Sequence, residues 1–257
     1  MNTKAFDEAM GEIDAGYVEK AMDYQPKAKK RGWARWAASA ACLALMVIAA
    51  VTIADWQWNR IELSDASVNV TARYTNKAPL WRTNDQLVFR TEEELFTVYN
   101  TAIFRGTVLE ISNIELNFNG SKAYRAIAEI EVEKVYRGPC AVGEVVSVLL
   151  PCPIEKGIWV EDTGVVSNMR AGAAGIFMPM VYNENSVWEQ NGARLILADI
   201  TEYGFADGVR YAFLEVDGGL LFDRHTYQSI SGARTLDEIE EYIGAMLERL
   251  PAPDEYE

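Results

Sequence analysis

The sequence predicts a mainly β outer domain with flanking helices, joined by a tether to one transmembrane helix and a short helical leader. Three observations support this fold class: an uncharged run long enough to cross a bilayer, a series of short apolar runs separated by turn residues, and two capping boxes that mark helices before and after that series. The predicted parts are a cytoplasmic leader (1–32), a transmembrane helix with interfacial flanks (33–58), a tether (59–86) and an extracytoplasmic domain (87–257).

The leader contains one apolar stripe at the spacing of a helix. Its members recur every three or four residues, which is typical of one face of an amphipathic helix. They are Phe6, Met10, Ile13 and Tyr17. Because so short a helix has no core of its own, we expect these four side chains to bind a cytoplasmic regulatory protein. The alternative is a frayed, solvated tail.

The transmembrane helix is predicted from residues 36–54, which include no charged side chain. Nineteen residues at about 1.5 Å each span about 28 Å, close to the hydrocarbon thickness of about 30 Å. Two pairs of tryptophans flank the run, and such amphipathic rings favour the headgroup region. They are Trp33, Trp36, Trp56 and Trp58. A cleaved signal peptide is the alternative, but its apolar core would be only about 7 to 15 residues long.

Charge near the run predicts the orientation. Five basic residues lie between positions 27 and 35, whereas Asp55 follows the run directly, so the N-terminus should be cytoplasmic and the C-terminal domain outside the cell membrane. The whole net charge of −14 falls on residues 59–257. Such an acidic domain repels nucleic acids and anionic lipids, which leaves proteins, cations or neutral molecules as its outer ligands.

The leader FDEAMGEIDAGYVEKAM, followed by the span WARWAASAACLALMVIAAV, resembles single-pass membrane proteins of Clostridia-like Gram-positive bacteria, some of them similar to anti-sigma factors. The resemblance implies a cytoplasmic partner. It does not extend to the zinc-binding module of such factors, which needs a histidine and a Cys-x-x-Cys pair on the cytoplasmic side. The chain's one histidine, His225, lies far beyond the span, and no cysteine precedes the span.

The outer part reads as short strands between two helices. Thr91 and Thr235 each begin a capping box, which predicts helices to about residue 100 and to Leu250, where Pro251 prevents continuation. The second helix places Leu236 and four further apolar residues on one face. The predicted strands are 68–74 within the tether, then 102–111, 124–136, 145–150, 175–181, 195–200 and 211–216.

The segment FRGTVLEISNIELNFNGSKAYRAIAEIEVEKVYRGPCAVGEVVSVLLP resembles the first strands of OB-like barrels of the tissue-inhibitor-of-metalloproteinases kind. In that comparison Gly106, Gly138 and Gly143 occupy the glycine positions at strand bends and starts. The resemblance implies an OB-like β-barrel as the outer domain. Proteinase inhibition is not implied, because the amino-terminal cysteine and the disulfide framework of that family have no counterpart here.

The sequence predicts no catalytic residue, metal site or cofactor. His225 lies in FDRHTYQS without a nucleophile motif. Three alternating acidic residues on the strand 124–136 lie on one face and could bind Ca²⁺: Glu129, Glu131 and Glu133. Such a pattern more often keeps an exposed strand face solvated. A disulfide between Cys140 and Cys152 conflicts with the strand 145–150 between them, because that strand would separate its ends by about 20 Å.

These observations predict a membrane-anchored, non-enzymatic envelope sensor or interaction protein of an anti-sigma-like kind. The outer barrel would bind a protein or wall ligand, and the leader would contact a cytoplasmic regulator. The alternative is a membrane-tethered extracytoplasmic hydrolase or carbohydrate-active domain. A pocket with convergent carboxylates would favour the enzyme, and an apolar patch would favour binding.

Overall fold

A computed structural model describes residues 59–76, 87–154 and 163–250. The chain divides into two compact units, Met1–Asp55 and Trp56–Glu257, and all described residues belong to the second. The predicted span 36–54 and the leader stripe of Phe6, Met10, Ile13 and Tyr17 therefore lie outside the described residues. Within the described ranges, no helix has the length and apolar character needed to cross a bilayer.

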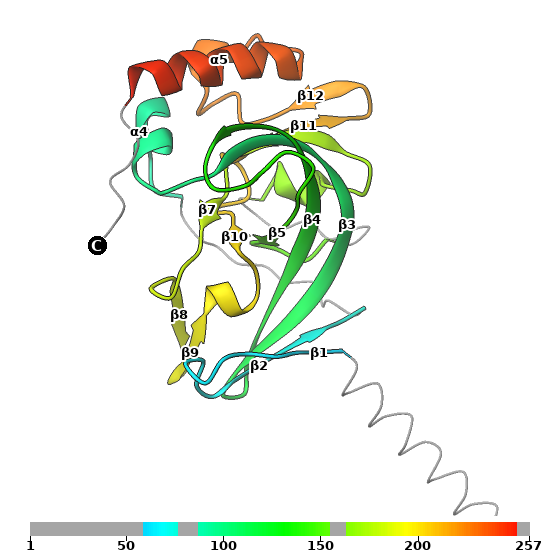
Figure 1. The fold of residues 1–257 in the computed structure, drawn as a ribbon, viewed down its shortest axis with the longest axis vertical. Coiled ribbons are helices and arrows are strands. Elements are labelled where there is room, and N and C mark those ends of the chain that lie inside the picture. Colours follow the sequence, from blue (N-terminus) through cyan, green and yellow to red (C-terminus); the bar gives the residue numbers. More distant parts are fainter. Residues whose placement is uncertain (1–58, 77–86, 155–162, 251–257) are drawn as a thin grey trace, which may run out of the picture. The chain divides into compact units, whose positions relative to one another are not determined.

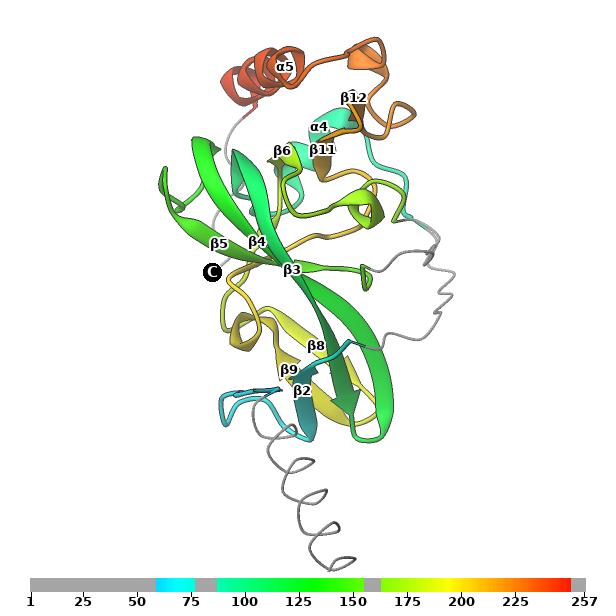
Figure 2. The same cartoon turned by 90° about the vertical axis from the view of Figure 1, so that its right-hand side faces the viewer.

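Ten strands of the described chain form one strongly curled sheet, which confirms the mainly β fold class. Its order is β12-β11-β6-β3-β4-β5-β10-β7, and β2 pairs with the far end of β3 and with β1. The bounds are β1 (Arg60–Ile61), β2 (Val70–Tyr74), β3 (Ile103–Phe118), β4 (Ser121–Arg137), β5 (Val145–Leu150), β6 (Ala174–Phe177), β7 (Met180–Val181), β10 (Tyr203–Gly204), β11 (Ala212–Val216) and β12 (Gly219–Leu221). Figures 1 and 2 show β3 and β4 bending together through the folded unit like half of a barrel.

The curl of the sheet has a local cause in β3. Its register with β4 shifts between Arg105 and Gly106, which is a β-bulge, and bulges increase the twist of a strand. A Cβ atom at Gly106 would lie 2.3 Å from the carbonyl oxygen of Glu131, so only glycine permits this close approach. At the far end the hairpin turns through Asn119 and Gly120, both with positive φ (49° and 94°), the conformation that tight two-residue hairpins require.

A second, two-stranded sheet lies over the far halves of β3 and β4. It consists of β8 (Val187–Gln190) and β9 (Ala193–Ile196), joined by a turn at Asn191 and Gly192 with φ of 51° and 70°. Trp188 and Leu195 of this hairpin share an apolar cluster with Phe118 and neighbouring side chains of β3 and β4. Figure 1 shows β8 and β9 beside β2, at the end of the unit opposite the long helix.

Two helices cover the other end of the sheet, as the sequence predicted. These are α4 (Glu92–Thr97) and α5 (Leu236–Arg249), and both begin with a complete capping box, at Thr91 and at Thr235. One face of α5 is buried over the main core, and Figure 1 shows the helix lying next to β11 and β12 with α4 beside it. Short 3₁₀ turns lie at Val166–Asn168 (η1), Leu197–Asp199 (η2) and Gln228–Ile230 (η3).

Several predicted strand bounds need correction. β3 continues to Phe118 instead of ending at 111, and the predicted strand 175–181 is divided at Pro179 into β6 and β7, since proline has no N–H for the ladder. The predicted strand 195–200 is β9 followed by η2. Strands β1, β8, β10 and β12 were not predicted, whereas β5 has the predicted bounds.

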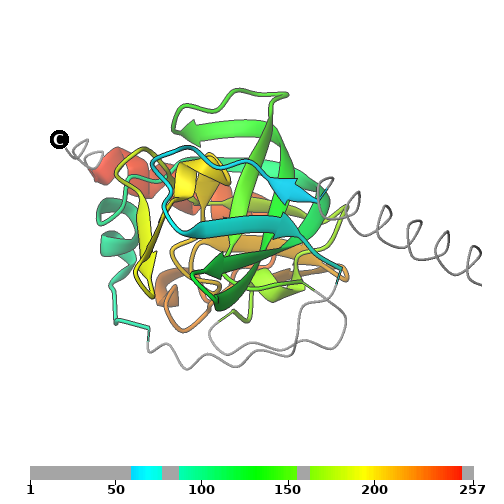
Figure 3. The same ribbon diagram turned by 90° about the horizontal axis from the view of Figure 1, so that it is seen from below.

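Residues 59–76 belong to the folded unit rather than to a free tether. β1 and β2 pair with each other, and β2 pairs along its whole length with β3. Arg73 of β2 and Lys122 of β4 both form ion pairs with Glu115 of β3, at 2.8 and 3.1 Å. Figure 3 shows these two cyan strands crossing the end of the unit.

Candidate binding groove

Aromatic contacts of Trp188 and a hydrogen bond of Gln190 hold the β8–β9 hairpin against the large sheet. The ring of Trp188 lies 4.7 Å from that of Phe118, and the guanidinium of Arg125 lies over the Trp188 ring at 4.7 Å. Gln190 donates a hydrogen bond of 2.8 Å to the hydroxyl of Ser121. Trp188 and Gln190 therefore face β3 and β4, and strand alternation turns Val187 and Glu189 to the other face.

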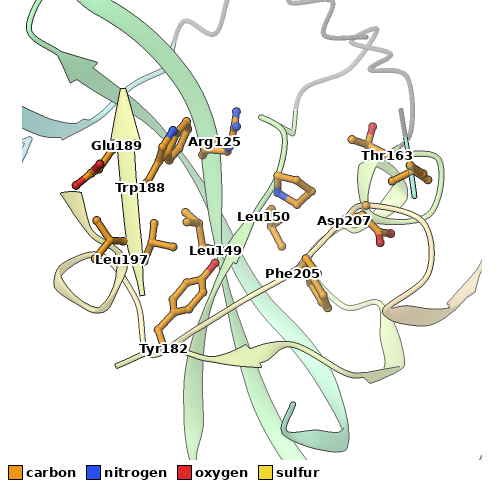
Figure 4. Close-up of a pocket in the computed structure, with 15 residues that line it drawn as sticks. Arg125, Leu149, Leu150, Thr163, Tyr182, Trp188, Glu189, Leu197, Phe205 and Asp207 are labelled. Carbon is orange, nitrogen blue, oxygen red and sulfur yellow. The ribbon is translucent and has the colours of Figure 1, made fainter. Parts of the chain in front are cut away.

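A cavity of about 410 Å³ lies between β8, the end of β5 and the chain after β10. Figure 4 shows the apolar side chains of Leu149, Leu150 and Phe205 between Arg125 and Trp188 on one side and Thr163 and Asp207 on the other, with the Glu189 side chain on the far side of β8. The remaining lining residues are Leu87, Pro151, Tyr182, Val187, Leu197, Ala206 and Gly208. The cavity thus has an apolar floor and a polar rim, as small binding sites generally do.

Tyr182 forms part of this wall because Gly204 leaves room for it. A Cβ atom at position 204 would lie 2.0 Å from the Tyr182 hydroxyl, so any larger residue would displace the ring. Burial raises the pKa of Tyr182 to about 12. The phenol consequently stays protonated at neutral pH and can donate a hydrogen bond to a ligand.

The carboxylate of Asp207, on the opposite side of the cavity from Trp188, is bonded to other groups of the protein. It accepts hydrogen bonds from the backbone N–H groups of Val209 and Arg210, at 2.9 and 2.8 Å, and forms a buried ion pair with the Arg210 guanidinium at 2.8 Å. Arg210 also donates to the carbonyl of Val88 at 2.7 Å. This carboxylate is therefore a structural acceptor, and a paired, fully bonded carboxylate is a poor general acid or base.

Two further hollows continue the first along β8. A hollow of about 730 Å³ is lined by Asn185, Ser186 and Val187, and it shares Tyr182, Val187 and Leu197 with the 410 Å³ cavity. A hollow of about 360 Å³ shares Glu189 and continues around the hairpin turn. We call this series of three hollows, lined in turn by residues 185–187, 187–189 and 189–194, the β8 groove.

The residues considered for chemistry from sequence alone do not line the β8 groove. His225 is exposed, and its backbone N–H donates to Asp223 within a turn. The acidic ladder of Glu129, Glu131 and Glu133 is exposed on β4. Among the described residues, no group of three histidine, cysteine, aspartate or glutamate side chains is placed to hold a metal ion.

Cys140 and Cys152 are buried and not joined by a disulfide. Strand β5 lies between them, as predicted. Burial raises the pKa of the Cys152 thiol to about 11, even though a hydrogen bond with Thr163 favours the thiolate. The thiol therefore stays protonated at neutral pH and is not an activated nucleophile.

Sequence reasoning missed every residue that forms the groove. Arg125, Leu149 and Trp188 are distant in sequence and meet only in the folded unit. One signal was available: the turn at Asn191-Gly192 with the alternating residues Val187–Gln190 before it predicts a hairpin. Nothing in that pattern indicates which edge of the hairpin stays open.

Comparisons with family models, with curated proteins and with solved structures find no match for this chain.

Proposed function

We propose that this protein is a membrane-anchored, non-enzymatic envelope sensor or interaction protein that binds a protein or wall ligand in the β8 groove. The observation that supports this most is the groove itself, in which three consecutive hollows follow one strand and the central one has an apolar floor. Concave sites with mostly apolar walls and a few polar groups are the usual ligand sites of proteins.

We further assign the curled sheet to an OB-like barrel. The supporting observation is the pairing order β3-β4-β5-β10-β7, in which β5 and β10 are parallel, together with a bridge between Thr101 and Met180 that brings β7 back to the start of β3. OB-folds are five-stranded, partly open barrels that bind ligands on their second and third strands and the adjoining loops. Arg125 and Leu149 would lie on those two strands, and β8 in an adjoining loop.

The net charge of the domain limits the kinds of ligand that it can bind. Residues 59–257 account for the whole net charge of −14, and the residues that line the cavity include Glu189 as well as Arg125. Nucleic acids would be repelled, whereas a basic or neutral ligand would be attracted or tolerated.

The membrane anchor and the cytoplasmic half of the proposal rest on sequence alone. Residues 36–54 would hold the chain in the cell membrane with the N-terminus inside, and the stripe of Phe6, Met10, Ile13 and Tyr17 would bind a cytoplasmic regulatory protein in the manner of an anti-sigma factor. The expected positions of charge and apolar residues support this arrangement. No nucleic-acid partner is proposed.

The alternative, an extracytoplasmic hydrolase or carbohydrate-active domain, gains some support from Glu189 and Asp207, two carboxylates bordering one cavity. A paired-carboxylate mechanism needs both groups available for proton transfer or attack. Asp207 accepts two backbone hydrogen bonds and an ion pair from Arg210, so it does not meet that need. Binding is therefore the better-supported function.

A substitution that fills the cavity tests the binding proposal. Ala206 lines the cavity, so Ala206→Phe should occupy its floor and abolish retention of solubilised envelope material on the immobilised full-length chain. The matched control is Ala198→Phe, an exposed position on η2 outside the cavity, which should retain as much as the wild type. Equal retention by the two variants would contradict the proposal.

A further inference from the structure

The first step concerns the backbone of β8. Its register with β9 pairs Val187 with Ile196 and Glu189 with Arg194, and Leu197 donates its N–H to the carbonyl of Ser186 at 2.8 Å. Hydrogen-bonded and non-hydrogen-bonded pairs alternate along an antiparallel ladder. Because Ser186 lies in a bonded pair, the N–H and C=O groups of Val187 and Glu189 point away from β9.

The second step is that the two edges of this hairpin differ. The outer edge of β9 is covered, since Val68 and Arg194 exchange two backbone hydrogen bonds of 2.8 and 2.9 Å, and the N–H of Ile196 donates to the Ser67 hydroxyl at 2.9 Å. On the β8 side, none of the residues in 59–76, 87–154 and 163–250 bonds to the outward backbone groups of Val187 and Glu189. Within the described part of the chain, the hairpin thus presents one open edge.

The third step is that this open edge borders the β8 groove. Residues 187–189 line the 410 Å³ cavity, whose floor contains Leu149, Leu150 and Phe205. An added strand would lie about 4.8 Å from β8, and its alternate side chains would point toward that floor. The cavity can hold one bulky apolar side chain of such a strand.

Together these observations lead to a ligand class. We propose that the β8 groove binds an extended polypeptide segment, which adds to the open edge of β8 as a further strand and inserts an apolar side chain between β8 and β5. This inference rests on the proposed function and specifies its ligand. Backbone hydrogen bonds to Val187 and Glu189 give affinity, and the cavity gives specificity, as in other complexes that extend a sheet.

Charge selects the partner further. Glu189 is exposed on the face of β8 opposite the cavity floor, so it favours basic residues that alternate with the apolar anchor. A second copy of this chain is a poor partner, because both outer domains carry a net negative charge. The segment therefore belongs to another polypeptide, with an apolar residue flanked by lysine or arginine.

The test uses the full-length chain and a defined probe. The probe is a fluorescent, end-capped nonapeptide, TKTKLKTKT, whose leucine and threonines lie on one face of a strand and whose lysines lie on the other. We expect saturable binding, measured by fluorescence anisotropy. Replacement of the central leucine with aspartate should weaken it by at least about tenfold, because the carboxylate would be buried without a partner.

The decisive variant removes one backbone donor. Glu189→Pro deletes an outward N–H without breaking a hydrogen bond to β9, and edge positions of this kind accept proline. It should weaken probe binding by about tenfold relative to Glu189→Thr, which loses the same charge but keeps the N–H. Equal affinity of the two folded variants would overturn the proposal.

A second comparison tests the proposal if the Glu189→Pro variant does not fold. Two isomers of the probe, N-methylated either on the lysines or on the threonines, should differ by about tenfold in affinity, since only one set of N–H groups faces β8. Equal affinities would overturn the proposal. So would a wild-type dimer that Glu189→Thr preserves and Glu189→Pro dissociates. Failure of the probe to bind, while Ala198→Phe retains envelope material and Ala206→Phe does not, would overturn the peptide alone and leave the proposed function standing.

Discussion

At the scale of single residues, a few carboxylates connect segments that are distant in sequence. Glu92 at the start of α4 accepts hydrogen bonds from the backbone of Ser229 at 2.9 Å and from the hydroxyl of Tyr242 on α5 at 2.8 Å. Asp199 accepts bonds from Ser64 and Ser67, including one of 2.6 Å from the Ser67 hydroxyl. Each carboxylate accepts hydrogen bonds from a part of the chain distant in sequence, so its loss should loosen a contact between elements.

Glu92 gives a pH-dependent prediction. Burial raises its pKa, but the hydrogen bonds from Ser229 and Tyr242 outweigh burial and hold the pKa below its ordinary value of 4.5. A lowered folded-state pKa means that the stabilisation is present above that ordinary value and is lost as pH falls through the folded-state pKa. Glu92→Gln should therefore reduce the free energy of unfolding by about 1 kcal/mol at neutral pH, with the difference vanishing in acid.

Denaturant unfolding of the full-length chain at several pH values measures this difference. The control is Glu248→Gln on the exposed side of α5, which should match the wild type throughout. A deficit for Glu92→Gln that stays constant from neutral pH to acid would show that the carboxylate charge is not responsible.

At the scale of elements, the sequence predicted the two helices because contacts within one turn determine where each of them begins. The capping boxes at Thr91 and Thr235 satisfy free backbone N–H groups within one turn, so both helices could be read from four residues each. The short strands could not. β10 has two residues, and its strand form depends on pairing with β5 and β7, which lie elsewhere in the sequence.

The same division applies to the candidate site. The turn that forms the β8–β9 hairpin depends on neighbouring residues and can be predicted from the sequence. Which edge of the hairpin stays open depends on distant residues, because Val68 pairs with β9 and β5 lies across the cavity from β8. The sequence predicts too early an end for β3, because the last third of this strand pairs with β2, and the predicted strand 68–74 gave no sign of which strand it would pair with. Pairing between distant segments, and not side-chain chemistry, decided what remained unpredictable.

The helix α5 gives a prediction at this scale. Leu236 is 4% exposed at its first turn, against the main core. Leu236→Asp should lower the free energy of unfolding by about 4 kcal/mol, because the packing is lost and a carboxylate is buried without a partner. Denaturant unfolding of the full-length chain measures the loss.

The control places the same residue on the exposed side of α5. Glu241→Asp should cost about a few tenths of a kcal/mol, the difference in helix propensity. Similar losses for the two variants would mean that α5 does not pack as described.

At the scale of the whole molecule, the groove is connected to the residues that follow the predicted membrane span. Val68 exchanges two backbone hydrogen bonds with Arg194 of β9, and Ser64 and Ser67 bind Asp199 directly after that strand. The loop between β1 and β2 thus attaches the hairpin of the groove to the N-terminal end of the folded unit. A ligand on β8 would contact the same hairpin that holds residues 64–68.

The central claim is that the β8 groove is the binding site, and amide hydrogen exchange on the full-length chain tests it most directly. The chain is compared with and without the envelope ligand that Ala198→Phe retains. We predict slower exchange at residues 182–190 and 205–208, which include much of the lining of the β8 groove, and unchanged exchange in α5. Protection confined to α5 or to the exposed face of β4, with residues 182–190 unaffected by the bound ligand, would contradict the claim.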